Sequence, residues 1–310
     1  MRSSIASLSD VSQSLYNTRE AVMRVLKSVL VAAGVLGLTC PAISQSDNPP
    51  QTSDGYRLVD PENLIILTLE TGEVVIELND DFAPGHAEQI RQFVRDGIYD
   101  RQRFYRVIDG FVAQGGLENE QRIAVYPTIQ NENDRAISDA DFAPLGNADL
   151  FAPEVGHIGG FAVARDEELD REWLLHCPGA LALARDADPD SGSTEFYIVL
   201  APQRYLDRNL TVFGRVLSGM QYVQKLKRGD RAVASGVIQA PEKGDQMLSV
   251  KLAADILEDE RPVWEVMQTP SEQWEARKTQ ARVRDDPFFY RKPPEVLDVC
   301  SIEVPAREVK

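Results

Sequence analysis

The sequence is short of cysteine, histidine and positive charge. Its 310 residues contain three cysteines and three histidines, and 49 acidic side chains outnumber 33 basic ones, which gives a net charge of −16. A chain this acidic is repelled by phosphate backbones and by anionic lipid surfaces. We therefore expect neither nucleic acid nor a membrane surface to be its main partner.

The scarcity of histidine and cysteine also argues against a metal site. The candidate ligands are His86, His157, His176 and Cys177. No pair of them has the spacing of zinc ligands, and His176 and Cys177 would point to opposite faces of a strand. The sequence also lacks a nucleophile elbow and a phosphate-binding loop. We expect no metal and no cofactor.

Residues 1–44 are predicted to be a cleaved signal peptide. Two basic residues precede an apolar stretch, 29–38, of roughly ten residues, which is too short to span a bilayer comfortably. Small residues at 42–44 suit cleavage before Gln45, and Met23 is an alternative start. We expect export to the periplasm without stable membrane insertion; an uncleaved anchor in the inner membrane is the alternative.

Cleavage would leave two cysteines, Cys177 and Cys300, because Cys40 departs with the signal peptide. In an oxidising compartment two remaining thiols favour a disulfide, which would tie the C-terminal segment to the body of the protein. Two unpaired, buried thiols are the alternative that the sequence leaves open.

The middle of the chain carries most of the expected secondary structure. Residues 45–62 are rich in Pro, Ser and Asp and are predicted to be a linker, with order beginning near Asn63. β-Branched runs around Thr71-Gly72 predict a hairpin, and Pro84 is placed to open a helix. Many short strands with only two or three helices indicate a mainly antiparallel β architecture, for which a closed barrel is the natural solution.

Two segments extend this predicted domain of residues 63–256. The first is a long acidic insertion at about 118–176, which is expected to contain short elements of its own. It is read either as a tolerated surface insertion or as a flap or partner-docking surface. The second is a C-terminal extension, 257–310, with a predicted helix that starts at the capping box 269–272, with Pro270 as its first residue.

Five blocks of sequence, in order, resemble the cyclophilin-type peptidyl-prolyl cis-trans isomerases. They are Phe82-Ala83-Pro84, FYRVIDGFVAQGG at 104–116, the small-residue strand 179–184, TEFYIV at 194–199 and YLDRNLTVFGRV at 205–216. The similarity runs from about residue 63 to 226. It implies a closed eight-stranded antiparallel barrel capped by two helices, with an active groove on its outer face.

The resemblance also implies roles for individual residues. Arg106 takes the place of the catalytic arginine, Phe111 that of the floor of the proline pocket, and Gln114 that of a glutamine beside the arginine. The implied substrate-binding positions are Val112, Ala184, Arg185, Glu195, Tyr197, Tyr205, Leu206 and Leu210. Glu195 departs from the family, which usually has glutamine there, and we expect its carboxylate to pair with Arg106 and compete with substrate.

The function implied by the resemblance is the isomerisation of prolyl peptide bonds in unfolded or exported protein clients. The mechanism would be non-covalent, and the departures from the family pattern predict a slow or narrow enzyme. A peptide-binding or chaperone module on the same fold, without catalysis, is the alternative reading.

Overall fold

The main sheet contains eight of the strands in residues 54–309, the part of the chain that the computed structural model describes. These strands are β2 (Leu64–Leu69), β3 (Gly72–Leu78), β4 (Arg103–Val107), β5 (Val112–Gly116), β10 (Ala180–Leu183), β11 (Phe196–Val199), β12 (Val212–Ser218) and β13 (Met247–Leu252). All of their pairings are antiparallel. The predicted signal peptide, 1–44, lies outside the described residues.

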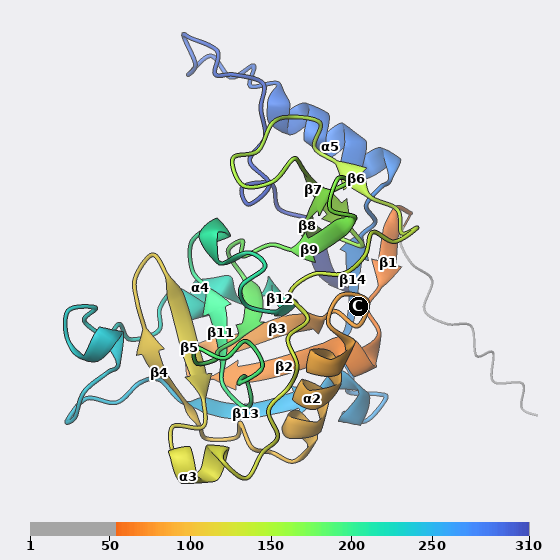
Figure 1. Cartoon of the computed structure of the whole chain (residues 1–310). Helices are drawn as coiled ribbons and strands as arrows, with labels where there is room; N and C mark the ends of the chain where they lie inside the picture. Colours follow the sequence, from red (N-terminus) through yellow and green to blue (C-terminus); the bar gives the residue numbers. More distant parts are fainter. Residues whose placement is uncertain (1–53, 310) are drawn as a thin grey trace, which may run out of the picture. The chain divides into compact units, whose positions relative to one another are not determined.

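The eight strands form a nearly closed barrel (Figure 1). Their order is β13-β2-β3-β12-β10-β11-β5-β4, and the two edges meet at the bridge between Arg103 and Gln246 and through neighbouring backbone hydrogen bonds, such as that from the Phe104 amide to the Asp245 carbonyl. The predicted fold class is confirmed, as is the hairpin around Thr71-Gly72, which is formed by β2 and β3. The barrel encloses the largest apolar cluster within residues 54–309.

Strand alternation decides which residues reach the outside of the barrel. On β11, Phe196 and Ile198 belong to the cluster inside the barrel, while Tyr197 and Val199 belong to a second cluster outside it. Successive side chains of a strand point to opposite faces. The sequence FYIV therefore places Tyr197 on the outer face of the barrel wall.

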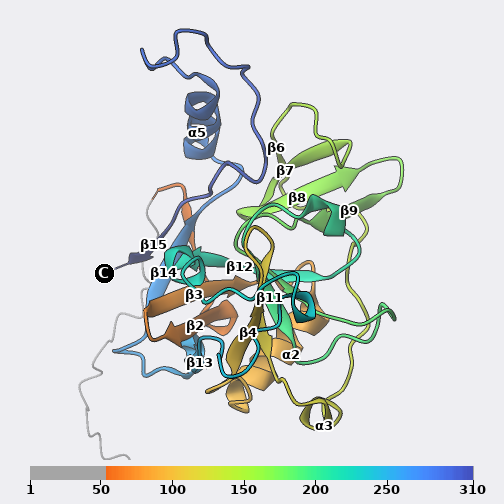
Figure 2. The ribbon, with the colours of Figure 1, turned by 90° about the vertical axis from the view of Figure 1, so that its left-hand side faces the viewer.

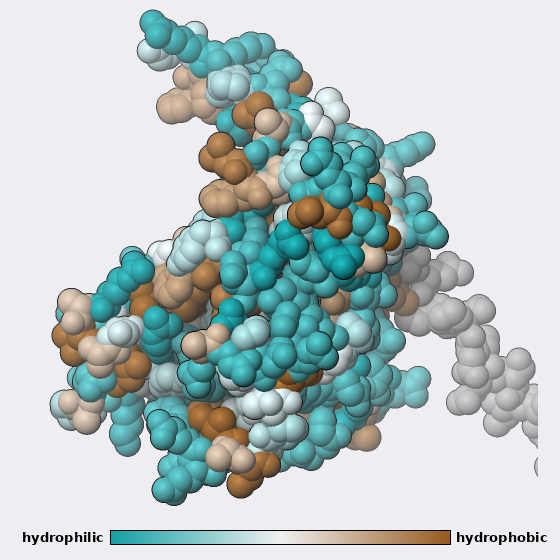
Figure 3. Space-filling model, viewed as in Figure 1, coloured by the Kyte–Doolittle hydropathy of each residue, from teal (hydrophilic) through white to brown (hydrophobic). Residues whose placement is uncertain are grey.

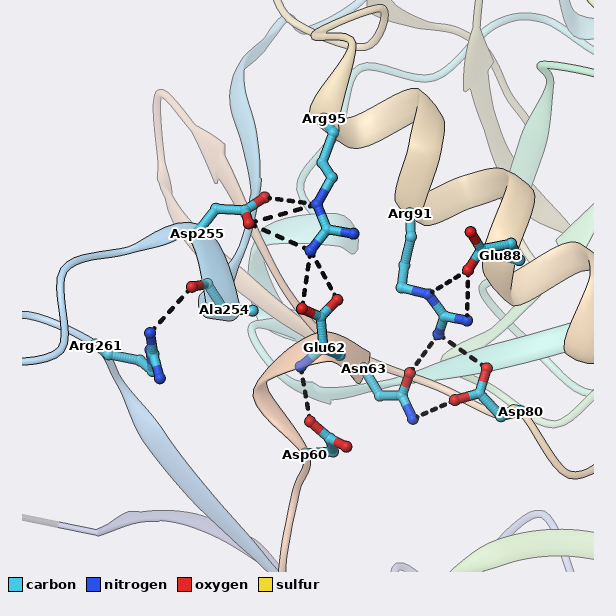
Figure 4. A network of polar contacts seen from close by, with 10 residues as sticks. All are labelled: Asp60, Glu62, Asn63, Asp80, Glu88, Arg91, Arg95, Ala254, Asp255 and Arg261. Atoms are coloured by element: carbon cyan, nitrogen blue, oxygen red, sulfur yellow. Dashed lines mark hydrogen bonds and ion pairs between the residues drawn. The ribbon is translucent and has the colours of Figure 1, made fainter. Parts of the chain in front are cut away.

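Helix α2 (Pro84–Arg95) covers one end of the barrel. Proline occupies the first turn, the predicted apolar residues Ile90, Phe93 and Val94 are buried, and the chain leaves the helix at Gly97 with a φ of +67°. Figure 4 shows two arginines on its exposed face, Arg91 and Arg95, bonded to carboxylates of other segments. These contacts fix the helix on the barrel end.

Three further helices are present among residues 54–309. They are α3 (Glu120–Ile123), α4 (Met220–Val223) and α5 (Glu272–Arg282). The helix predicted in the C-terminal extension is therefore present, but its predicted start is wrong, because Ser271 and not Thr269 is the N-cap. The Ser271 side chain accepts a hydrogen bond of 3.1 Å from the Trp274 amide, and Pro270 precedes the cap.

The insertion forms a sheet of its own. Its strands are β6 (Ala143–Pro144), β7 (Glu154–Ile158), β8 (Phe161–Asp166) and β9 (Arg171–Leu174), paired in sequence order. Ile158, Phe161 and Val163 of this sheet pack in the same apolar cluster as Tyr197. The insertion is thus part of the outer wall of the barrel.

The C-terminal extension lies at the same end of the barrel as the insertion sheet in both views (Figure 1 and Figure 2). Trp274 of α5 is fully buried in an apolar cluster with Trp173 of β9. Cys177, just after the insertion, and Cys300, in the extension, form a disulfide bond. The insertion and the C-terminal extension therefore share one small core.

A three-stranded sheet joins the two ends of the described chain. It consists of β1 (Tyr56–Leu58), β14 (Val263–Met267) and β15 (Ala306–Val309), with β14 in the centre. β1 lies inside the segment 45–62 that the sequence predicts to be a linker, so that prediction is wrong from Tyr56 onward. A strand of three residues gives little local signal, and its hydrogen-bonding partner is about two hundred residues away.

The face shown in Figure 3 is mostly hydrophilic, and apolar side chains gather on it in separate small groups, one of them over α3. Isolated apolar groups are normal on a protein surface. Within residues 54–309, no helix is long and apolar enough to cross a membrane.

Candidate active site

The site is built on the β4–β5 hairpin. Gly110 turns the chain between the strands with a φ of +65°, a conformation that glycine adopts without strain. The register of the hairpin then sets Arg106 on β4 directly opposite Gln114 on β5. Phe111 stands between the turn and β5, so the three residues with implied catalytic roles are brought together by one local element.

Two of the three guanidinium nitrogens of Arg106 donate hydrogen bonds within the protein. Nη1 donates a hydrogen bond of 3.0 Å to Oε1 of Gln114, and Nε donates one of 2.9 Å to the carbonyl oxygen of Ser235. Its central carbon lies 5.7 Å from the centre of the Phe111 ring. Within residues 54–309 the third nitrogen, Nη2, makes no hydrogen bond and the guanidinium makes no ion pair. A fixed positive charge with one unused donor edge therefore stands beside an aromatic ring.

An apolar surface adjoins the arginine. Its members are Phe111, Val112, Ala184, Tyr197 and Leu210, which pack in one cluster on the outer face of the barrel. Val112 and Tyr197 are buried, whereas the other three are partly exposed. The structure thus gathers five of the predicted site residues into one apolar cluster, three members of which are partly exposed beside the arginine.

The remaining predicted residues border this surface less closely. Tyr205 is 58% exposed and Leu206 is partly buried, and both lie in the short 3-10 helix Arg204–Leu206. The guanidinium of Arg185 donates hydrogen bonds of 3.1 and 2.6 Å to the carbonyl oxygen of Asn209. Arg185 therefore ties two loops together with its side chain.

Glu195 does not pair with Arg106, contrary to the expectation from the sequence. Nε2 of Gln114 donates a hydrogen bond of 2.8 Å to the hydroxyl of Tyr105, which in turn donates to Oε1 of Glu195. The hydroxyl of Tyr105 thus separates the carboxylate from the guanidinium. One series of hydrogen bonds links Arg106 to Glu195 through Gln114 and Tyr105. Within the described residues, no ion pair joins the carboxylate of Glu195 directly to the guanidinium of Arg106.

The protonation states of Glu195 and Tyr105 follow from their surroundings. Burial raises the pKa of Glu195 above its usual value, and the charges of Asp186 and Glu118 raise it further, while the hydrogen bond from Tyr105 opposes them. Burial also raises the pKa of Tyr105, and the charge of Glu195 adds to this effect. Tyr105 therefore stays protonated at neutral pH and continues to donate to Glu195.

Replacing Glu195 with glutamine is predicted to stabilise the protein at neutral pH. The folded-state pKa is raised above the ordinary 4.5, so the stability contributed by Glu195 is complete below pH 4.5 and is lost as the pH rises through the folded-state value. Glutamine keeps the acceptor for Tyr105 without the charge. Chemical denaturation should give Glu195→Gln and the wild type nearly equal free energies of unfolding at about pH 4, and the variant the larger value at pH 7. The raised pKa would be contradicted if the free energy of unfolding of the variant, minus that of the wild type, were smaller at pH 7 than at pH 4.

The hydrogen-bonding partner of Tyr197 was not predicted from the sequence. The hydroxyl of Tyr197 lies 2.9 Å from Nε2 of His176, and Nδ1 of His176 lies 3.0 Å from Oδ1 of Asp207. The signal that could have revealed a partner is the hydroxyl itself, because a buried tyrosine normally has a hydrogen-bonding partner. Sequence alone could not identify His176, which is the last residue of the insertion.

The other histidines lie away from this site. Nδ1 of His86, on α2, is 2.6 Å from Oε2 of Glu132, and His157, on β7, packs against the ring of Trp274. Burial lowers the pKa of His157 to about 3, so this histidine is neutral. Among residues 54–309 no three His, Cys, Asp or Glu side chains are grouped so that they could hold a metal ion.

A cavity of about 630 Å³ lies beside the disulfide, between β12, the insertion sheet and the extension. Its lining includes both disulfide cysteines, Arg215 and Met220, but none of the predicted site residues. Arg215 is engaged by Glu77 and by the carbonyl oxygen of Gly160. The site on the β4–β5 hairpin is an exposed surface separate from this cavity.

The chain is similar to known proteins over both the site and the surrounding fold. Residues 64–252 match the family model described as cyclophilin type peptidyl-prolyl cis-trans isomerase/CLD. A probable peptidyl-prolyl cis-trans isomerase of Brucella suis is 33% identical over 223 residues, which cover 71% of this chain and 94% of that protein. Peptidyl-prolyl cis-trans isomerase B of Bacillus subtilis is 30% identical over 163 residues, or 52% of this chain and 89% of the relative.

A solved structure extends the likeness beyond the matched domain. The crystal structure of cyclophilin AquaCyp293 from Hirschia baltica superimposes with a TM-score of 0.67 at 28% sequence identity, and the match covers 82% of this chain and 93% of that one. So wide a match includes sequence outside residues 64–252, the span of the family model.

Proposed function

The chain belongs to the cyclophilin-type peptidyl-prolyl cis-trans isomerases, and from this premise we propose that Arg106 catalyses rotation about prolyl bonds without forming a covalent bond. Rotation about a peptide bond has a barrier of about 18–20 kcal/mol, and uncatalysed prolyl isomerisation takes tens to hundreds of seconds. The barrier comes from amide resonance, so a group that weakens resonance in the twisted state accelerates the reaction.

The observation that carries this proposal is the unused edge of the Arg106 guanidinium. Nε and Nη1 are fixed by Ser235 and Gln114, and Nη2 remains available beside Phe111. A hydrogen bond from Nη2 to the prolyl nitrogen is available only when the amide is twisted, because that nitrogen then regains its lone pair. The interaction therefore stabilises the transition state more than either ground state.

The arginine supplies only part of the acceleration. A hydrogen bond to a charged group is worth roughly 1.5–3 kcal/mol net, which corresponds to about one to two factors of ten in rate. In the proposal the rest comes from the apolar surface, which holds the proline ring while contacts to the flanking residues keep the peptide near its twisted form. Phe111, Ala184 and Leu210 are the partly exposed members of this cluster and can contact the ring, while the buried side chains of Val112 and Tyr197 support them from beneath.

The experiment that tests this assignment is catalysed isomerisation of a short proline peptide by the wild type and by Arg106→Ala. The proposal requires turnover by the wild type and a loss of turnover in the variant. Turnover that survives in the variant would remove Arg106 from the mechanism.

We further propose that the enzyme acts on unfolded, proline-containing proteins in the periplasm. The disulfide between Cys177 and Cys300 supports an oxidising compartment, since reducing compartments keep thiols free. The signal-like segment before Gln45 supports the same location. Slow prolyl isomerisation limits the folding of newly exported chains, which gives the enzyme a substrate there.

The mature protein is predicted to begin at Gln45. Mass spectrometry of the protein recovered from the periplasmic fraction of cells that express the full chain would check this, with cleavage between residues 44 and 45 as the expected result. A chain that keeps residues 29–38 and sediments with the inner membrane would contradict it and favour the anchored form.

A further inference from the structure

His176 contacts several parts of the active site, although it was not among the site residues predicted from the sequence. It is fully buried, with 0% of its surface exposed, and it uses both ring nitrogens and both backbone polar groups. The histidine lies at the junction between the insertion and the barrel, next to Cys177 of the disulfide. Its four contacts lead to three separate elements of the site.

The first contact reaches the apolar surface. Nε2 lies 2.9 Å from the hydroxyl of Tyr197, and the two rings stack with their planes 19° apart. Asp207 lies within 3.0 Å of Nδ1, and a carboxylate can only accept there, so Nδ1 carries the proton. Nε2 is then the acceptor for the Tyr197 hydroxyl. This bond fixes the position of the Tyr197 ring on the outer face of the barrel.

The two contacts of the His176 backbone reach the loops on either side. Oδ1 of Asp207 also accepts a hydrogen bond of 2.9 Å from the His176 amide, and Asp207 directly follows Leu206. The carbonyl oxygen of His176 accepts a bond of 2.9 Å from the Gln203 amide, whose side chain donates one of 3.0 Å to the carbonyl of Gly110. Gly110 precedes Phe111, so His176 also supports the turn that carries the floor of the site.

The arrangement of Tyr197, His176 and Asp207 has the order of a nucleophilic triad, but it cannot act as one. Tyr197 is only 4% exposed, and burial raises the pKa of its hydroxyl, so no substrate reaches a reactive phenolate. The bonds therefore serve to hold side chains in place. That leaves positioning as the role the geometry supports.

We propose that His176 is a positioning residue for the isomerase reaction, which holds Tyr197 and the loops carrying Phe111 and Leu206 in the arrangement that receives the proline ring. The proposal rests on the proposed function of the site. The insertion then contributes to the substrate-binding surface, because its last residue, His176, contacts Tyr197. Without His176, the buried Tyr197 hydroxyl lacks a partner, and the ring moves to satisfy it.

Isomerase kinetics of His176→Ala and the double variant His176→Ala/Tyr197→Phe test the proposal. The single variant should lose about tenfold in kcat/KM, mainly through a higher KM, because the displaced tyrosine ring obstructs the bound proline. The double variant should regain most of that loss, since phenylalanine has no hydroxyl to satisfy. A single variant with unchanged kcat/KM, or a double variant without recovery, would overturn the proposal.

Two conservative variants separate the contacts and still decide the question if the alanine variant does not fold. Glutamine can present an acceptor near the position of Nε2, and asparagine can present a donor near that of Nδ1. His176→Gln should keep more activity than His176→Asn if the bond to Tyr197 matters most. Equal or greater activity in the asparagine variant would contradict the role assigned to that bond.

His157 provides a matched control. It is another buried histidine of the insertion, 2% exposed, and its Nδ1 has no hydrogen-bonding partner within the described residues. His157→Ala should alter stability while kcat/KM per folded molecule stays unchanged; an equal loss in both alanine variants would show a purely structural effect. Arg106→Ala measured in parallel separates the two proposals, because intact activity in that variant rejects the proposed mechanism, whereas a loss confined to it rejects only the role of His176.

Discussion

Arg106→Ala is expected to lower kcat/KM for a proline tetrapeptide by about 10- to 100-fold, the factor that corresponds to losing one hydrogen bond from a charged donor. The guanidinium is fixed by Gln114 and the carbonyl of Ser235, so its donor edge is already aimed before substrate arrives. A donor that is already oriented before substrate binds loses little free energy to reorganisation, so most of the free energy of its hydrogen bond stabilises the transition state. The protease-coupled isomerisation assay measures this directly.

Arg231 offers a matched control for this substitution. Its guanidinium carbon lies 5.6 Å from the centre of the Phe111 ring, nearly the same distance as that of Arg106, at 5.7 Å. Within residues 54–309 it makes no hydrogen bond or ion pair, so nothing aims its donors. Arg231→Ala should change kcat/KM by less than about threefold, within the range of an exposed charge contact. Equal losses in the two variants would mean that positive charge near Phe111, rather than an aimed donor, drives catalysis.

Removing the disulfide is expected to cause the largest loss of stability. Cys177 and Cys300 are 123 residues apart, and cross-linking so long a loop restricts the unfolded chain strongly. The double variant Cys177→Ser/Cys300→Ser should lose about 2–5 kcal/mol in the free energy of unfolding. Denaturant titration of the mature protein measures this as a lower transition midpoint.

The same bond can be examined without mutation. Thiol labelling of the denatured, unreduced mature protein should find no free cysteine, and reduction of the wild type should lower its midpoint to that of the serine variant. Reduction should leave the midpoint of the serine variant unchanged, which controls for other effects of the reductant. Two reactive thiols in the unreduced protein, or a serine variant as stable as the wild type, would contradict a stabilising disulfide.

The features predicted correctly from the sequence are those that local rules determine. The hairpin at Thr71-Gly72 follows from turn chemistry between β-branched runs, and α2 follows from Pro84 and its apolar face. The eight-stranded barrel was predicted in another way, from the family resemblance of five ordered sequence blocks. The register of a short hairpin is also local, so Arg106 and Gln114 could be expected to lie together.

The features that were missed depend on long-range contacts. The strand β1 exists because β14, far along the chain, supplies hydrogen bonds to it. Glu195 is drawn away from Arg106 by the hydroxyl of Tyr105, ninety positions earlier in the sequence. His176 becomes part of the site because the insertion folds back over β11. A single sequence holds no signal for which of two distant polar side chains will meet.

Catalysed turnover of prolyl bonds by Arg106 is the central prediction for this protein. Nuclear magnetic resonance exchange spectroscopy on a proline tetrapeptide, with the enzyme at a small fraction of the peptide concentration, tests this most directly. We expect cis-trans exchange cross-peaks to appear with wild-type protein, the cis and trans populations to stay unchanged, and exchange to be much weaker with Arg106→Ala. Peptide that binds, seen as line broadening or shifts, but shows no catalysed exchange would contradict this prediction and identify a binding module instead.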